Sequence, residues 1–194
     1  MKLDIDITGD LAQLTAAFRQ SPKKVQQATA RALRKLTRFA ERQVLRTLAR
    51  EQNLTQSLLK KLGRVRVSLK SSEEGYRLIV WVGLQDIPAH YLGKVSATPW
   101  GVRTGKHRWE GAFLMQPANA AHPMVFKRKA HWVHKLQRST TSGRILWIGL
   151  PIAKQRLPIY DAAHRAITQL EPKLLDRFAT LMQQELNYAF HVQS

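Results

Sequence analysis

The sequence contains no cysteine among its 194 residues. Disulfides, thiolate metal ligands and cysteine nucleophiles are therefore excluded, and folding in a reducing compartment is expected. No segment holds the roughly 20 apolar residues that a membrane span needs, and the N-terminus lacks the apolar stretch of a signal peptide. We expect a soluble protein without a cleavable leader or a membrane partner, made in a cytoplasm.

Acidic residues are scarce: 13 Asp and Glu stand against 32 Lys and Arg, a formal net charge of +19. Residues 1–63 carry 13 basic and 5 acidic groups, net +8, and residues 64–157 carry 16 and 4, net +12. Residues 158–194 carry 3 and 4, net −1. Because such an excess repels itself unless something negative lies nearby, the basic regions predict an anionic partner and the last segment predicts protein contacts.

Because carboxylates are scarce, few residues are available as catalytic groups or metal ligands. A two-metal nuclease needs several convergent acidic ligands, and only Asp86 and Glu110 can be nominated. His131 and His134 lie three residues apart in an expected strand, which sends them to opposite faces, and no glycine-rich phosphate loop is present. We expect no enzymatic activity, no metal site and no cofactor, and the nuclease is the last-ranked alternative.

The order of patterns predicts one α+β domain over residues 1–194: a helical part (1–63), a β-rich part (64–157) and a C-terminal helix (158–194). A period-two strand opens the chain, and a helix is expected over residues 10–18. Residues 64–70 and 76–84 form an expected antiparallel hairpin at the centre of the sheet, and residues 131–137 and 144–150 a second one. Trp81 and Trp147 lie inside apolar strands and are expected in the core.

A long basic amphipathic helix is predicted from Pro22, behind the cap residue Ser21, to about Arg50. Apolar residues from Val25 to Ala40 recur on one side at 100° per residue, with a dense cationic side opposite. A typical solvated face mixes charge signs, so this one is expected to meet a polyanion or acidic neighbours. The DNA-facing candidates, including the basic tract that follows the expected arm, are Arg31, Arg34, Lys35, Arg38, Arg42, Lys127, Arg128 and Lys129.

Residues 94–110 contain several turn-forming residues and no helical period, which predicts a projecting loop or β-arm. Basic residues alternate there with tryptophan, a side chain that stacks on bases or anchors in a protein groove. For these tryptophans, burial in the core and exposure in a contact are weighed equally. The candidates for contacts between subunits are Lys94, Trp100, Arg103, Lys106, Arg108 and Trp109.

Four short strings occur in an order that resembles the prophage minor tail protein Z family of long-tailed bacteriophages. They are Gly111-Ala-Phe113, Val125-Phe-Lys-Arg-Lys129, Ile148-Gly-Leu-Pro-Ile152 and Leu186-Asn-Tyr-Ala189. The similarity covers mainly the C-terminal half. The chain departs from the more basic members of the family by carrying its tryptophan-containing arm where they have dense Arg and Lys runs.

The resemblance implies a non-enzymatic virion protein that acts late in tail completion and head–tail joining, in the tail or neck. It implies a homo-oligomeric ring, neighbouring tail or neck proteins as partners, and double-stranded DNA passing through the channel. Synthesis is expected in the cytoplasm of the bacterial host. The alternative is a stand-alone basic nucleic-acid-binding protein, which needs only the same charge and exposed aromatic rings.

Overall fold

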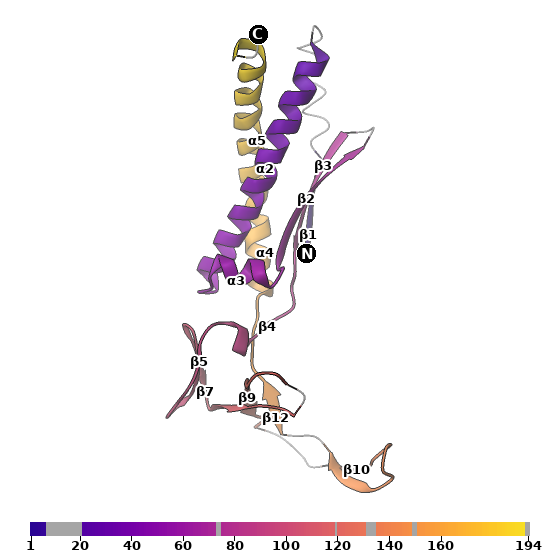
Figure 1. Ribbon diagram of the computed structural model, residues 1–194, viewed down its shortest axis with the longest axis vertical. Helices are drawn as coiled ribbons and strands as arrows, with labels where there is room; N and C mark the ends of the chain where they lie inside the picture. The colour runs from indigo at the N-terminus through magenta and orange to yellow at the C-terminus, as the bar shows by residue number, and fades with distance from the viewer. Residues whose placement is uncertain (7–20, 73–74, 119, 131–134, 149–150, 193–194) are drawn as a thin grey trace. The chain divides into compact units, whose positions relative to one another are not determined.

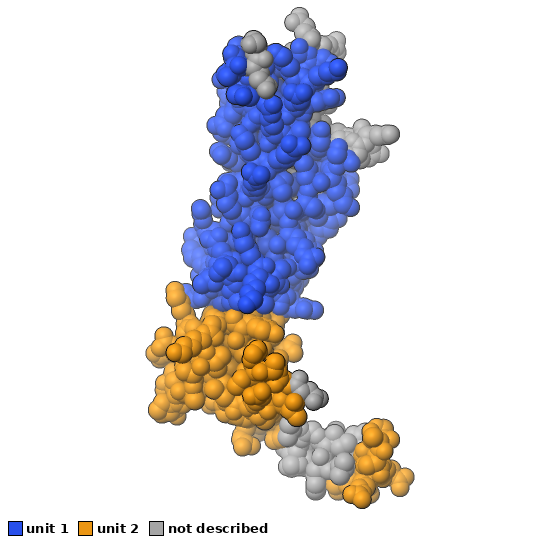
Figure 2. Space-filling model, viewed as in Figure 1, with its two compact units in different colours: residues 1–85, 159–194 blue, residues 86–158 orange. Residues whose placement is uncertain are grey.

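The computed structural model describes residues 1–6, 21–72, 75–118, 120–130, 135–148 and 151–192 (Figure 1). The chain is an α+β protein with antiparallel sheets and C-terminal helices, as the sequence predicts. It divides into two compact units, coloured separately in Figure 2: residues 1–85 with 159–194 form unit 1, and residues 86–158 form unit 2. The helix expected over residues 10–18 lies outside the described residues.

The first of these units combines both ends of the chain. The C-terminal helices return to pack on the long helix near the N-terminus, so unit 1 is made of two distant pieces of chain. Local patterns of charge and hydrophobicity do not reveal such a long-range return. None of the helices within the described ranges is long and apolar enough to cross a membrane.

Unit 1 is built around one long helix and a three-stranded antiparallel sheet of order β1-β3-β2. The long helix α2 packs against α3, α4, α5 and the β2–β3 hairpin, and Figure 1 shows α2 and α5 side by side. The elements are β1 (Lys2–Asp6), α2 (Pro22–Glu51), α3 (Gln56–Lys61), β2 (Val65–Ser72), β3 (Gly75–Val82), α4 (Tyr160–Thr168), α5 (Leu170–Asn187) and the π-helical turn η2 (Tyr188–Val192).

The helix ends follow from local chemistry. Pro22 occupies the first turn of α2, where its missing N–H removes no helical hydrogen bond. Ser21 precedes it, but the Ser21 side chain makes no capping hydrogen bond. Thr55 caps α3, because its Oγ1 accepts a hydrogen bond of 3.2 Å from the Leu58 N–H. Pro172 lies in the first turn of α5, so it begins a second C-terminal helix instead of kinking a single one.

Strand β3 alternates strictly between the two faces of its sheet. Leu78, Val80 and Val82 are fully buried toward the helices, whereas Trp81 is 41% exposed. The expectation that Trp81 lies in the core is therefore wrong: period two places it on the outer face, where the Arg66 guanidinium lies 5.4 Å from its ring centroid. The side chain of Trp147 lies outside the described residues.

Unit 2 consists of short strands in small sheets. The elements are β4 (Ile87–Pro88), η1 (Ala89–Tyr91), β5 (Val95–Thr98), β6 (Gly101–Thr104), β7 (His107–Glu110), β8 (Ala112–Met115), β9 (Met124–Arg128), β10 (Lys135–Arg138), β11 (Ile145–Ile148), β12 (Ile152–Lys154) and β13 (Arg156–Leu157). The strand orders are β5-β6-β7, β12-β9-β8, β10-β11 and β13-β4. The second hairpin predicted from the sequence is β10–β11, in which Leu136 pairs with Trp147.

The segment 94–110, expected to be a projecting loop or a β-arm, consists of strands. It forms the β5-β6-β7 sheet, and Val102 of β6 is fully buried in a core cluster with Ala89, Ala112 and Val125. The frequent turn residues that suggested a loop instead connect four-residue strands through two-residue turns. The sheet is therefore part of the core of unit 2.

Candidate anion-binding surfaces

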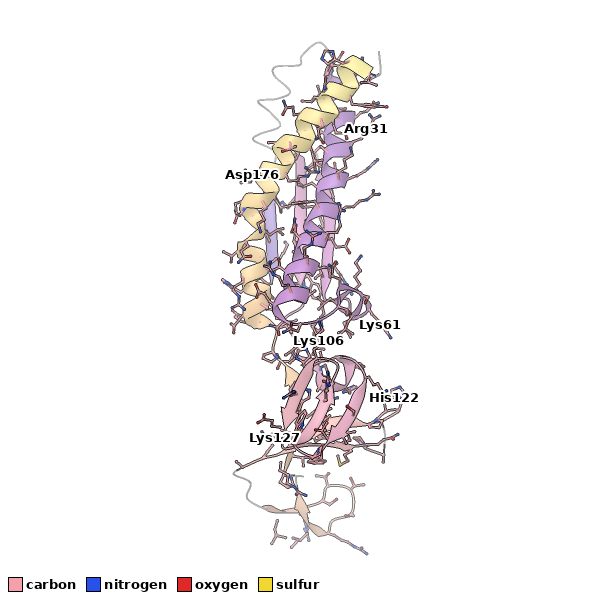
Figure 3. All side chains as sticks on the ribbon, turned by 90° about the vertical axis from the view of Figure 1, so that its left-hand side faces the viewer. Arg31, Lys61, Lys106, His122, Lys127 and Asp176 are labelled. Atoms are coloured by element: carbon pink, nitrogen blue, oxygen red, sulfur yellow. The ribbon has the colours of Figure 1, made fainter. Side chains whose placement is uncertain are left out.

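Five arginines follow one another at four-residue steps along α2, and all five are exposed. We call this set the arginine row: Arg34, Arg38, Arg42, Arg46 and Arg50. A helix rises 1.5 Å per residue, so neighbours in the row are about 6 Å apart along the axis and the row extends about 24 Å. Figure 3 shows side chains standing out from α2 at successive levels.

The exposure of the arginine row follows from the residues that are buried. Another set on α2 also recurs every four residues and is almost completely buried: Ala28, Ala32, Leu36, Ala40, Val44 and Leu48. The two sets are offset by two residues, which is about 200° around the helix. Each four-residue step also turns by about 40°, so both sets wind gradually around the helix and remain opposite each other at every level. Burying one set therefore presents the other to solvent.

The charge of the arginine row is not neutralised within the described part of the chain. The two carboxylates of α2 have other partners: Glu41 lies 3.9 Å from the Lys60 ammonium, and Glu51 lies 2.9 Å from the Arg165 guanidinium. Like charges at i and i+4 disfavour a helix by about 0.2–0.5 kcal/mol per pair. An anion bound along the row would relieve this repulsion.

Arg31 and Lys35, which were nominated with the DNA-facing residues, are directed to α5 and η2. The Arg31 guanidinium lies 5.5 Å from the ring centroid of Tyr188, and the Lys35 ammonium forms an ion pair with Glu185. Helical periodicity places Arg31 and Lys35 on the cationic side, but the antiparallel approach of α5 covers part of that side. Both therefore stabilise the helix pair, although Lys35 is also exposed. Of the candidates on α2, Arg34, Arg38 and Arg42 belong to the arginine row.

Arg46 and Arg50 were not among the sequence candidates. Both are exposed and continue the row beyond Arg42. The signal that identifies them is the unbroken four-residue spacing from Arg34 onward, which is visible in the sequence. The backbone also orders part of the row, since the Nε of Arg42 donates a hydrogen bond of 3.2 Å to the carbonyl of Arg38.

In unit 2, three consecutive nominated basic residues lie at the end of β9. Lys127, Arg128 and Lys129 are all exposed. The Arg128 guanidinium lies 5.9 Å from the ring centroid of Phe113, and the Lys129 N–H donates a hydrogen bond of 2.7 Å to the Pro151 carbonyl. They belong to a different unit from the arginine row, and they remain candidates for an anion contact.

The β5-β6-β7 sheet separates the remaining candidates onto two faces. Arg103 and Arg108 lie on its outer face, while Lys94, Trp100 and Lys106 are exposed beside the strands.

Trp109 is not on that face. It lies opposite Val102 in the register, packs against the core cluster, and donates a hydrogen bond of 2.7 Å from its indole Nε1 to the buried Thr104 Oγ1. Trp109 is therefore a core residue of unit 2, because strand alternation turns it away from Arg108.

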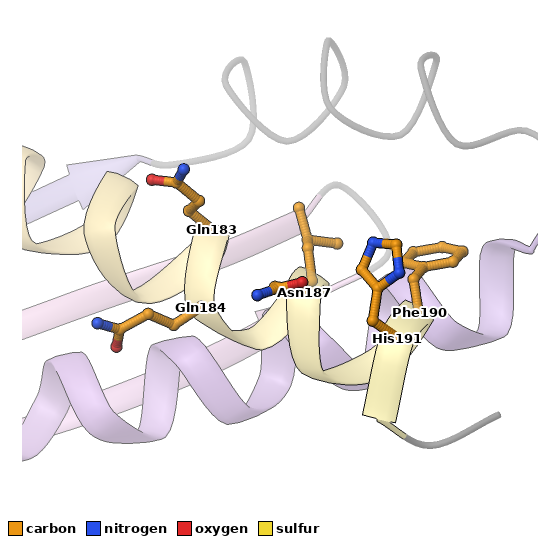
Figure 4. A pocket seen from close by; sticks show the side chains of 6 residues that line it. Gln183, Gln184, Asn187, Phe190 and His191 are labelled. Atoms are coloured by element: carbon orange, nitrogen blue, oxygen red, sulfur yellow. The ribbon is translucent and has the colours of Figure 1, made fainter.

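The described residues contain no cluster of three His, Asp or Glu side chains that could hold a metal ion. His131 and His134 lie outside the described residues, and the nuclease candidates Asp86 and Glu110 are both exposed. A pocket of about 460 Å³ near the end of α5 has a lining without any carboxylate, Lys or Arg (Figure 4). Its lining residues are Gln183, Gln184, Leu186, Asn187, Phe190 and His191.

Comparison with models of protein families, with curated proteins and with solved structures finds no match to this chain.

Proposed function

We propose that this chain is a structural component of a bacteriophage tail or neck, which acts in tail completion and head–tail joining beside the DNA channel. The observation that carries the proposal is the arginine row on α2, five exposed guanidinium groups at intervals of about 6 Å without carboxylate partners in the described residues. Because each four-residue step turns by about 40°, the row winds around part of the helix, and neighbouring members of it can contact the phosphates of duplex DNA. The proposed role is not catalytic.

Two further features support this role. Residues 158–194 have a net charge of −1 in a chain of +19, and their helices α4 and α5 cover the side of α2 away from the row. A subunit of a ring around DNA needs one cationic side toward the axis and a less charged side toward protein. The four ordered strings that resemble the minor tail protein Z family agree with the same position in the virion.

The experiment is to test for the protein in purified virions and tails and to locate it by electron microscopy. We expect a ring at the head-proximal end of the tail, with the α2–α5 pair recognisable in each subunit and the arginine row turned to the channel. Absence of the protein from every particle would overturn the proposal. A position elsewhere on the particle, with α2 away from DNA, would also contradict the channel role.

A stand-alone nucleic-acid-binding protein is the second candidate, and the same arginine row favours it. This candidate requires the isolated protein to bind duplex DNA with an affinity that falls steeply as salt rises. Location separates the two functions, because a stand-alone binder would associate with intracellular DNA and be missing from purified particles.

A further inference from the structure

The outer face of the β5-β6-β7 sheet carries two arginines directly opposite each other. Arg103 of β6 pairs in register with Arg108 of β7, and both side chains are exposed. Like charges directly opposite on antiparallel strands destabilise a sheet. Within the described residues neither guanidinium has a carboxylate partner. Arg103 and Arg108, which we call the arginine pair, therefore repel each other, and a bound anion would relieve this repulsion.

Each guanidinium is held in place by a neighbour. The Nε of Arg103 donates a hydrogen bond of 3.0 Å to the Gly105 carbonyl, and the Arg108 guanidinium lies 5.4 Å from the ring centroid of Trp100. These contacts leave the terminal N–H groups of both side chains for a ligand. Because the two planar guanidinium groups are already held in place, less side-chain entropy is lost when a ligand binds.

The sheet beneath the arginine pair is closely packed. Val102 and Thr104 are fully buried on its inner face. Gly101 has φ 149°, and a Cβ there would lie 2.2 Å from the Trp109 carbonyl oxygen. Gly105 has φ 58°, and its Cβ would lie 2.6 Å from the Leu92 carbonyl oxygen. The first approach joins β6 to β7, and the second joins the turn between them to Leu92. A packed sheet positions a binding group more accurately than a loop does.

We propose that the arginine pair binds the carboxylates of an extended acidic segment from a partner protein. A guanidinium matches a carboxylate through two parallel hydrogen bonds. Alternate side chains of a strand lie on one side about 6.6 Å apart, close enough to the spacing of cross-strand neighbours for two arginines to meet a Glu-x-Glu motif. This proposal deepens the proposed function by naming the chemistry of a protein partner, and only the partner's place in the virion rests on that function.

The surroundings of the arginine pair favour carboxylates over a phosphate chain. Glu110 lies on the same face, opposite Gly101, and limits the positive charge to a short stretch. Single-stranded nucleic acids stack successive bases on several exposed rings. Here Trp109 is turned inward, and the exposed Trp100 ring is already contacted by Arg108.

The test uses the full chain, a fluorescein-labelled peptide with a Glu-x-Glu core and a Gln-x-Gln peptide of the same length. Anisotropy titrations at low ionic strength compare the wild type with R103Q/R108Q. The matched control is K94Q/K106Q, which removes the same charge from two exposed residues of the same segment. Thermal unfolding and tryptophan fluorescence of both variants check that the sheet remains folded.

We expect the wild type to bind the Glu peptide and not the Gln peptide. R103Q/R108Q should lose about tenfold or more in affinity, and K94Q/K106Q less than about threefold. Equal losses in the two variants would overturn the proposal, because general charge would then explain binding. So would failure of the wild type to bind the Glu peptide, or a dependence on the arginine pair seen only with an oligothymidylate of equal charge. None of these results bears on the location of the protein in virions or on DNA binding by the arginine row, so the two proposals fail separately.

Discussion

The ammonium group of Lys35 on α2 forms an ion pair with the carboxylate of Glu185 on α5, which is only 5% exposed. The pair joins two helices that lie far apart in the sequence. The neighbouring contacts follow the same antiparallel course, with Arg31 on Tyr188 and the Arg177 guanidinium 5.8 Å from the ring centroid of Phe39. Lys35 is therefore a structural contact of unit 1.

Lys35→Met should lower the free energy of unfolding by about 1–3 kcal/mol, because it leaves the Glu185 carboxylate buried without its cation. Because the Lys35 side chain is largely exposed, the loss should be smaller than for a fully buried ion pair. Urea unfolding measures this loss of free energy. The double variant K35M/E185Q should recover much of the loss, since no buried charge remains, and an unchanged stability of K35M would contradict the assignment.

Arg38→Gln with Arg42→Gln should weaken binding to duplex DNA and reduce the slope of log K against log salt by about 1.8, since each phosphate contact contributes about 0.9. The control K70Q/K173Q removes the same charge from two exposed residues of unit 1 that lie outside the arginine row. Its slope should stay close to that of the wild type. Equal slopes for the two variants would mean that DNA does not bind preferentially to the arginine row.

Thr104→Val should destabilise unit 2 by about 1–3 kcal/mol, because it leaves the indole N–H of Trp109 without its acceptor in a packed site. The near-ultraviolet circular dichroism of the tryptophans and thermal unfolding report this change. Ser96→Ala on the outer face of the same sheet is the control, and it should change stability little. Similar stabilities of the two variants would argue against the buried hydrogen bond.

Two glycines with positive φ should respond differently to alanine. Gly101→Ala brings a Cβ to 2.2 Å from a backbone oxygen, so a loss of about 3 kcal/mol or more is expected. Gly143 has φ 67° with no atom within 4 Å of its added Cβ, so only the cost of the left-handed conformation, about 1–2 kcal/mol, remains. Thermal unfolding compares the two, and hydrogen exchange of the β6 amides locates the damage.

Acidification should destabilise unit 2 through two histidines. Burial, followed by the charges of Lys154 and His122, lowers the pKa of His90 below its ordinary 6.5, and burial lowers the pKa of His107. The unfolded chain then binds more protons than the folded one, so stability is complete above about pH 6.5 and is lost as the pH falls through the lowered folded values. Denaturant unfolding between about pH 7 and 5 measures this loss, and H90Q/H107Q should flatten it.

The periodic features of the chain could be predicted from the sequence because they depend on local geometry. The alternation of Leu78, Val80 and Val82 sets the buried face of β3, and the C-terminal helices follow from the helical period after Pro158. Other features needed the tertiary structure. Trp81 and Trp109 both lie in strands, yet Trp81 is exposed and Trp109 packs against the core of unit 2.

The sequence by itself determined the arginine row, because an intrahelical spacing of four residues places Arg34 to Arg50 opposite the buried set whatever covers that set. Only the tertiary structure decided which basic side chains pair with groups of the protein itself and which remain exposed for a partner. Lys35 is paired because α5 returns antiparallel with Glu185 at its level, and Arg103 meets Arg108 because a two-residue turn sets the register of β6 and β7. Such pairings depend on how distant or adjoining segments align in space, which residue type and periodicity do not encode.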